Sequence, residues 1–229
     1  SEVDFFIGAN YLITIHDGAL KPLTRLYGEC EQAEAARAQH MGKGAGRLLY
    51  NILDRMVDYC FPMLSKVGQR IQRIEDELFT ADGRKLVQEI SIVRRDIISL
   101  HSIIKPQIAI VSNLERRERP FIQEDLDVYF SDIVDGFSRA WDLLQDYEEL
   151  IVGLSATGDS LISYRTNEII RILTVISVIM LPMTLVSSIY GMNVSLPMED
   201  HPLTFVLIVL FMLGAAGGMI GYFHHRGWV

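Results

Sequence analysis

Residues 172–190 read ILTVISVIMLPMTLVSSIY, and residues 203–223 read LTFVLIVLFMLGAAGGMIGYF. These stretches hold 19 and 21 residues without one charged side chain. Roughly 20 apolar residues are enough for a helix to cross the hydrocarbon core of a bilayer. Helices of soluble proteins rarely lack a polar face over such a length. The two stretches therefore predict a membrane protein with two transmembrane helices.

The charged residues around these stretches predict the orientation of the chain. Arg165 and Arg171 precede the first span and Arg226 follows the second, whereas the connecting loop 191–202 contains no Lys or Arg. Positive residues favour the cytoplasmic side of a membrane. We therefore expect a multi-pass protein of the cell (inner or plasma) membrane with both termini in the cytoplasm.

The composition argues against several other classes of protein. The net charge of −8 is unsuited to nucleic acid, whose recognition needs a basic face. Cys30 and Cys60 lack the spacing of a disulfide framework or a thiolate zinc site. The sequence contains no HExxH motif and no nucleotide-binding fingerprint. We predict that the protein is not an enzyme.

The segment before the spans reads as a mainly helical body. Apolar residues recur at three and four positions from Leu48 to Leu78 and again from Ile90 to Ile104, which predicts a hairpin of two amphipathic helices. A third helix begins near Gln123 and reaches Tyr190 without a strong break, a length of about 100 Å. The chain starts at Ser1 inside an apparent strand, so we expect an N-terminal portion to be missing. The predicted domains are a partial cytoplasmic α/β domain (1–46), a cytoplasmic helical hairpin (47–119), a stalk helix (120–171), a first transmembrane pore helix (172–190), an external loop (191–202), a second transmembrane helix (203–223) and a cytoplasmic tail (224–229).

One face of the third helix carries a mixture of polar and bulky apolar side chains. Hydroxyl groups on this stripe could contact hydrated ions, and rings of apolar side chains could gate a pore by dewetting. Alternatively, the hydroxyls bond to the backbone of their own helix. A two-span chain cannot enclose a pore alone, so transport requires an oligomer. Stepping back from Asn193 by three and four residues gives the candidate pore-lining residues Thr184, Leu181, Ser177, Leu173, Ile170, Asn167, Ser163 and Asp159.

The second span carries four glycines at small-xxx-small spacing. Gly214 and Gly218 are four residues apart, as are Gly217 and Gly221. Such spacing lets transmembrane helices approach closely. We therefore expect these glycines to pack against the first span.

The end of the first span carries the segment Tyr190-Gly191-Met192-Asn193. A Gly-Met-Asn triplet at the end of the first of two C-terminal spans, after a very long helix, resembles the CorA family of magnesium channels. Residues 166–168 (TNE), 181–185 (LPMTL) and 197–199 (PME) are also similar to that family. The resemblance extends over nearly the whole chain.

This resemblance implies a homopentameric funnel in which the stalk helix continues into the pore helix. Gly191, Met192 and Asn193 would form the selectivity filter, with a ring of Asn193 amides selecting hydrated Mg²⁺. Glu199 and Asp200 in the external loop would raise the local cation concentration. The family also closes when cytosolic Mg²⁺ occupies acidic sites between subunits, and Asp54, Asp132 and, more weakly, Asp58 match those sites by position.

The sequence departs from the family pattern at the inner end of the pore. Ala156 stands where many members carry an aspartate, and Asp159 lies about one turn away. The tail holds His224 and His225 in place of a run of lysines. Two alternatives remain: a transporter of Zn²⁺, Co²⁺ or Ni²⁺ with the same fold, and a coiled-coil membrane scaffold or sensor that transports nothing.

Overall fold

The computed structural model describes residues 2–80, 83–115, 126–192 and 203–228 of the 229-residue chain. The chain forms two compact units, Ser1–Gly158 and Asp159–Val229. Six helices and two short strands make up the described residues, which confirms the predicted, mainly helical class.

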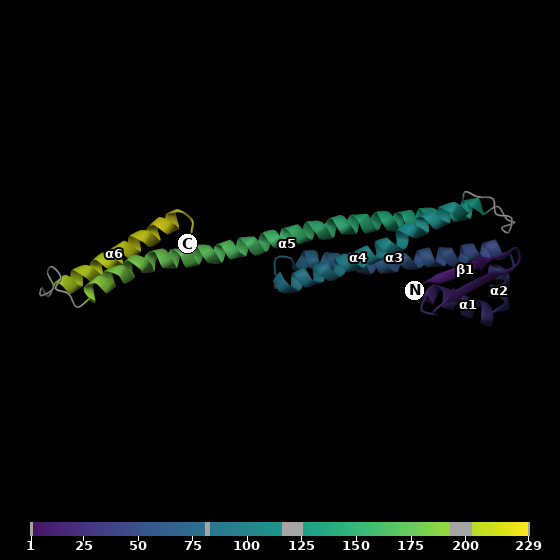
Figure 1. The fold of residues 1–229 in the computed structure, drawn as a ribbon, viewed down its shortest axis with the longest axis horizontal. Helices are drawn as coiled ribbons and strands as arrows, with labels where there is room; N and C mark the ends of the chain where they lie inside the picture. The colour runs from purple at the N-terminus through teal and green to yellow at the C-terminus, as the bar shows by residue number, and fades with distance from the viewer. Residues whose placement is uncertain (1, 81–82, 116–125, 193–202, 229) are drawn as a thin grey trace. The chain divides into compact units, whose positions relative to one another are not determined.

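The first unit begins with a two-stranded sheet and two short helices that lie beside the start of a long helix (Figure 1). Strands β1 (Val3–Ile7) and β2 (Leu12–His16) are antiparallel, with Val3 opposite His16 and Ile7 opposite Leu12. Helices α1 (Lys21–Gln32) and α2 (Glu34–Met41) follow. A small apolar core joins these elements to the long helix and contains Leu23, Leu26, Cys30 and Ile52, with Phe5, Leu12, Leu48 and Met56 packed around it.

Two long helices, α3 (Ala45–Glu77) and α4 (Gly83–Glu115), form the expected hairpin. Gly44 adopts a φ of +89°, so it provides the break that separates α2 from α3. Buried apolar side chains recur along both helices at helical spacing, as Leu64, Val67 and Ile71 do in α3. An ion pair of 2.8 Å between the Arg70 Nη1 and Asp96 Oδ2 atoms also joins the two helices.

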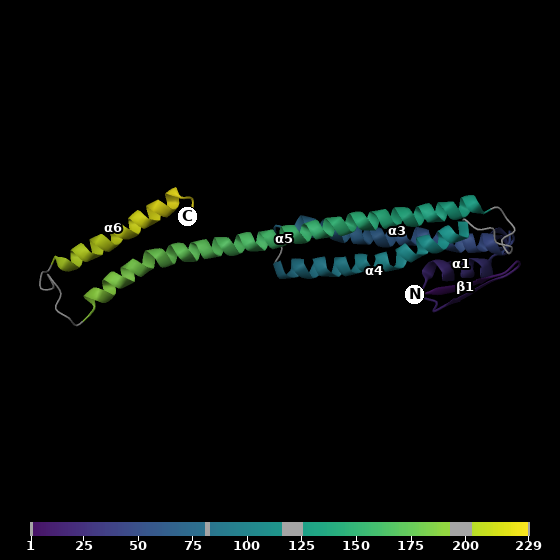
Figure 2. The same ribbon diagram turned by 45° about the horizontal axis from the view of Figure 1, so that its top comes forward.

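Helix α5 (Asp127–Tyr190) begins in the first unit and continues into the second. The predicted start near Gln123 lies outside the described residues. Figure 2 shows the first part of α5 beside α3 and α4. Three contacts with α3 fix a parallel register, because the partners always differ by 79 in residue number: Tyr50 with Tyr129, Val57 with Gly136, and Gly68 with Tyr147.

The second unit consists of the remainder of α5 and helix α6 (Thr204–His225). The partly or fully covered residues of α5 include Val175, Ile179, Pro182 and Val186, which recur at four, three and four positions and so share one face. A groove of about 320 Å³ between the two helices is lined by Val186, Tyr190, Thr204, Leu207, Ile208 and Phe211.

The glycines of α6 do not pack against α5, so that prediction was wrong. A Cβ atom added at Gly214, Gly217, Gly218 or Gly221 would meet no atom within 4 Å. The covered residues of α6 lie on its opposite face and are Thr204, Ile208, Met212, Ala215, Ala216, Met219 and Phe223. Small-xxx-small spacing fits any close helix neighbour, and here flexible methionines and alanines form the contact instead.

The end of α6 is closed by backbone hydrogen bonds and a ring stack. Gly227 has a φ of +70°, and its N–H donates to the His224 carbonyl. The Trp228 N–H donates to the Phe223 carbonyl at 2.9 Å, and the Trp228 ring stacks on Phe223. This is a Schellman motif with its usual apolar contact.

Among the described residues, three helices are long and apolar enough to cross a membrane: α4, α5 and α6. Helix α4 differs from the other two because its apolar side chains are used inside the first unit, where Val93 and Ile97 are fully buried. In α5 beyond Gly158, Val175 is the one buried residue, and in α6 no described residue is buried. The apolar surfaces of the second unit therefore require an apolar environment from outside the single chain.

Candidate functional site

The candidate pore-lining residues share the face of α5 that α6 leaves uncovered. All eight residues, from Asp159 to Thr184, are exposed, and the large apolar side chains Leu173 and Leu181 are 62% and 70% exposed. A helix turns by about 100° per residue, so Ser177 and Thr184 lie about 200° from Val175 and Pro182 of the covered face. The stripe is thus available for contact with ions or with other molecules.

The hydroxyls on this helix are hydrogen-bonded to their own backbone. Thr184 Oγ1 donates to the Met180 carbonyl at 2.9 Å, and Ser177 Oγ donates to the Leu173 carbonyl at 2.8 Å. Each hydroxyl has one hydrogen and two acceptor lone pairs, so a donated hydrogen leaves the oxygen free to accept. Bonding to the helix and contact with an ion's water shell are therefore compatible.

The segment that follows the first span is described only in part. The Gly191 N–H donates to the Ser187 carbonyl at 3.0 Å, and the Met192 N–H donates to the Ile189 carbonyl at 3.3 Å. The Met192 side chain is exposed. Three further residues of the predicted filter and external loop lie outside the described part of the chain: Asn193, Glu199 and Asp200.

The three candidate regulatory acids lie close to one another where α3 and α5 cross. A Cβ atom on Gly136 would be 2.6 Å from Val57 Cγ1, so the glycine allows the helices to approach here. Asp54 is half-buried, and Asp58 and Asp132 are exposed. Burial, followed by the negative charges of Asp58 and Asp132, raises the pKa of Asp54 above its ordinary value. The site therefore holds excess negative charge.

The chemistry of these carboxylates fits a weakly ligated magnesium ion. Mg²⁺ prefers oxygen ligands and usually keeps several of its waters while one or two carboxylates bind it. Over the described ranges, no three His, Cys, Asp or Glu side chains converge closely enough to enclose a metal ion. One chain thus offers carboxylates for a partial site, in which waters would complete the coordination, and not a complete cage.

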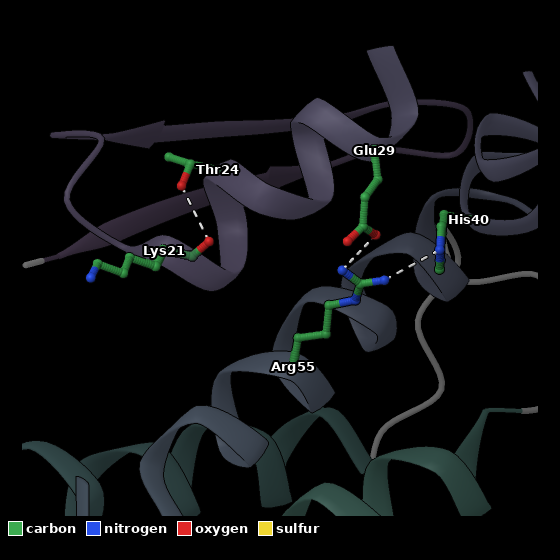
Figure 3. A network of polar contacts seen from close by, with 5 residues as sticks. All are labelled: Lys21, Thr24, Glu29, His40 and Arg55. Carbon is green, nitrogen blue, oxygen red and sulfur yellow. Dashed lines mark hydrogen bonds and ion pairs between the residues drawn. The ribbon is translucent and has the colours of Figure 1, made fainter. Parts of the chain in front are cut away.

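Next to Asp54, Arg55 belongs to a different network, which joins α3 to α1 and α2 (Figure 3). The Arg55 Nη1 atom pairs with Glu29 Oε2 at 2.8 Å, and its Nη2 atom lies 3.5 Å from His40 Nε2. The hydrogen bond from Arg55 lowers the pKa of Glu29. The Arg55 guanidinium is thereby held toward α1, and its ion pair is with Glu29 and not with Asp54.

A second arginine near the acids was missed by the sequence analysis. The Arg47 guanidinium carbon lies 4.0 Å from the centre of the Tyr129 ring and 4.9 Å from that of Tyr50. The two rings also meet edge to face at 5.1 Å. Arg47, Tyr50 and Asp54 are spaced by three and four residues, which could have placed them on one face of α3, but Tyr129 is brought in only by the helix register.

The fold and the candidate site together define a class: a helical membrane protein with a charged helical body and an uncovered polar stripe on its longest helix. Residues 1–225 match the model of the family described as CorA-like Mg²⁺ transporter protein. The chain belongs to this family, whose members are transporters.

Individual relatives agree with this assignment. The cobalt/magnesium transport protein CorA of Thermotoga maritima is 30% identical over 188 residues, which cover 82% of this chain and 54% of that protein. A zinc transport protein, ZntB of Pectobacterium carotovorum, is 22% identical over 191 residues, covering 81% of this chain and 57% of its own length. The chain thus spans little more than half of either relative.

A solved structure confirms the fold. The CorA magnesium transporter of Methanocaldococcus jannaschii matches with a TM-score of 0.85 at 24% identity, covering 98% of this chain and 71% of that one.

Proposed function

We propose that this chain carries Mg²⁺ across the cell membrane through a homopentameric channel lined by α5. The observation that supports this most strongly is the exposed stripe opposite the α6-covered face, with its oriented hydroxyl oxygens. A single copy presents one such stripe, so several copies around an axis are needed to enclose a path. Leu173 and Leu181 would form apolar constrictions between the polar rings.

The stripe suits a cation that keeps its water shell. Waters bound to Mg²⁺ point their hydrogens outward, and the ion dehydrates reluctantly. The oxygens of Thr184 and Ser177 have donated their hydrogens to the helix and can accept from those waters. A ring of Asn193 amides, with Gly191 and Met192 shaping the turn, would select the ion at the outer mouth, and Glu199 and Asp200 would concentrate cations there.

Cytosolic Mg²⁺ would regulate the channel at the α3–α5 crossing. Asp54, Asp58 and Asp132 repel one another, and a divalent cation with its waters would relieve that repulsion. The single chain offers no complete cage over its described residues, so a neighbouring copy would complete the site. Both termini would then be cytoplasmic, with the 191–202 loop outside.

A second candidate cargo is Zn²⁺, with Co²⁺ or Ni²⁺ as related choices. The similarity to a zinc transport protein supports this alternative, as does the name of the Thermotoga relative, a cobalt/magnesium transport protein. Met192 in the Gly-Met-Asn triplet favours magnesium, because the triplet of the zinc-carrying branch typically varies at this position.

Flux into liposomes with a trapped Mg²⁺ indicator tests the proposal. Thr184→Val removes one hydroxyl per copy at nearly constant volume and should slow flux by about fivefold or more, the equivalent of roughly 1 kcal/mol of lost hydrogen bonding. Thr157→Val is the matched control. Thr157 Oγ1 donates to the Gly153 carbonyl at 2.9 Å in the same way, but it lies about 180° around the helix from Thr184 and therefore outside the stripe.

Four results would count against the proposal. Equal flux in the two threonine variants would contradict the proposed pore-lining stripe. Unchanged flux in Asn193→Ala would contradict the proposed filter. Absence of any metal flux would favour the non-transporting scaffold. If Zn²⁺ or Co²⁺ blocks Mg²⁺ entry at a concentration below that of the Mg²⁺ present, the alternative cargo would be favoured.

A further inference from the structure

Arg47 lies beside the acids at the α3–α5 crossing, yet it makes no ion pair with them. No carboxylate lies within ion-pair distance of its guanidinium in the part of the chain that the structure describes. Its positive charge nevertheless acts on Asp54, whose pKa it lowers against the stronger raising effects of burial and of neighbouring acids. Arg47 is therefore a nearby cation that leaves the carboxylate oxygens open.

Two tyrosine rings hold this charge in place. The guanidinium lies over Tyr129 from α5 and Tyr50 from α3, at 4.0 and 4.9 Å from the ring centres. Cation–π contacts of this kind contribute about 0.5–1 kcal/mol each at exposed sites. The same helix register that aligns Tyr50 with Tyr129 brings Asp132 beside Asp54, so the clamp and the acids form together.

The other arginine near Asp54 is less suited to this role. Arg55 also lowers the pKa of Asp54, by more than Arg47 does, but its charge is balanced by the Glu29 carboxylate, with which it pairs at 2.8 Å. Of these two cations, Arg47 alone is fixed by rings from both helices that carry the regulatory acids.

We propose that Arg47 is a built-in counter-charge that sets the Mg²⁺ concentration at which the acidic site fills. This inference rests on the proposed regulatory role of Asp54 and Asp132. A fixed positive charge near the site repels an incoming divalent cation, so more Mg²⁺ is required for occupancy than the acids alone would need. The clamp maintains this penalty, because movement of the guanidinium away from the arriving ion would cost the two ring contacts.

The size of the effect follows from Coulomb's law. Arg47 precedes Asp54 by seven residues, about 10 Å along the helix axis. At low ionic strength, a unit charge at about 10 Å from a divalent ion in water-like surroundings changes its binding constant by about fourfold. Removal of the charge should therefore lower the half-saturating Mg²⁺ concentration by about fourfold.

The test is a MgCl₂ titration of the full chain in detergent at constant ionic strength, with the thermal unfolding midpoint as the readout. Binding to the native state stabilises it by RT ln(1 + [Mg²⁺]/Kd), so a fit of the midpoints to this relation gives the half-saturating concentration, Kd, without measuring transport. Arg47→Gln and Arg47→Met should both lower the half-saturating concentration by about fourfold. Arg47→Lys, which keeps the charge, and Arg70→Gln, which removes an arginine about four turns beyond Arg55 on the same helix, should leave it unchanged.

An unchanged or higher half-saturating concentration in the two neutral variants would overturn the inference. A shift in Arg47→Lys equal to that in Arg47→Gln would also overturn it, because the guanidinium shape and not the charge would then matter. The double variant Asp54→Asn/Asp132→Asn separates failure of the proposed regulatory site from failure of the inference about Arg47. If its half-saturating Mg²⁺ concentration equals that of the wild type, the proposed regulatory site is wrong, whatever the Arg47 variants show.

Discussion

Gly136→Ala tests whether the close approach of α3 and α5 builds the acidic site. The added methyl group would stand 2.6 Å from Val57 Cγ1, about 1 Å inside an ordinary carbon–carbon contact. Val57 is 5% exposed and β-branched, so it has little freedom to move. Overpacking of this kind destabilises by about 1–3 kcal/mol. Alanine returns about 1 kcal/mol of helix propensity, which leaves a net loss of about 1 kcal/mol.

Gly153→Ala in the same helix is the matched control. A Cβ atom at Gly153 would meet no atom within 4 Å, so this variant should gain up to about 1 kcal/mol from helix propensity alone. The two variants should therefore differ by about 2 kcal/mol in the free energy of unfolding, measured by denaturant titration of the full chain in detergent. In a double-mutant cycle, Val57→Ala should remove most of the penalty of Gly136→Ala. Equal stabilities of Gly136→Ala and Gly153→Ala would refute the packing of α5 on α3 described above.

Two further predictions concern the acids and the end of α6. Because the pKa of Asp54 is raised, the native state binds the Asp54 proton more tightly than the unfolded chain does. Protonated Asp54 therefore contributes to stability below its ordinary pKa of 3.8, and this contribution is lost as the pH rises through the raised pKa. Asp54→Asn should accordingly raise the unfolding midpoint at neutral pH without Mg²⁺ and flatten its dependence on pH, and a lower midpoint would contradict this sign. Gly227→Ala places a side chain at a φ of +70°, at a cost of about 1 kcal/mol, and should release the Trp228 ring from Phe223. Tryptophan quenching by a soluble quencher should increase, relative to Gly28→Ala in α1, where a Cβ atom meets nothing within 4 Å.

The long helices could be predicted because their sequence signals are local. The apolar spacing of α3 and the absence of a break before Tyr190 depend only on neighbouring residues, and so do the charge-free stretches that give the second unit. The face of α5 that carries Thr184 and Ser177 could also be predicted, because helical geometry fixes which residues share a face. The family triplet then suggested a pore-lining role for those residues, which spacing alone left open.

The helix register and the use of the glycines could not be predicted in the same way. The offset that aligns Tyr50 with Tyr129 depends on where Gly136 and Gly68 allow backbone and side chains to approach, and that contact is long-range. In the sequence, Arg47 is consequently one more charge at the start of a helix. The glycines of α6 carry a packing signal, but the sequence does not identify the helix that they contact.

The hydrogen bonds along α5 also indicate whether the stripe suits cations or anions. A free hydroxyl can turn its hydrogen toward an anion or its oxygen toward a cation's water shell. At Thr184, Ser177 and Thr174 the hydrogen is already donated to the preceding turn. Presentation of that hydrogen to an anion would break an internal bond of about 1 kcal/mol at each position, whereas acceptance from a hydrated cation breaks none. Back-bonding therefore biases these oxygens toward hydrated cations before any contribution from Asn193 or the acidic residues.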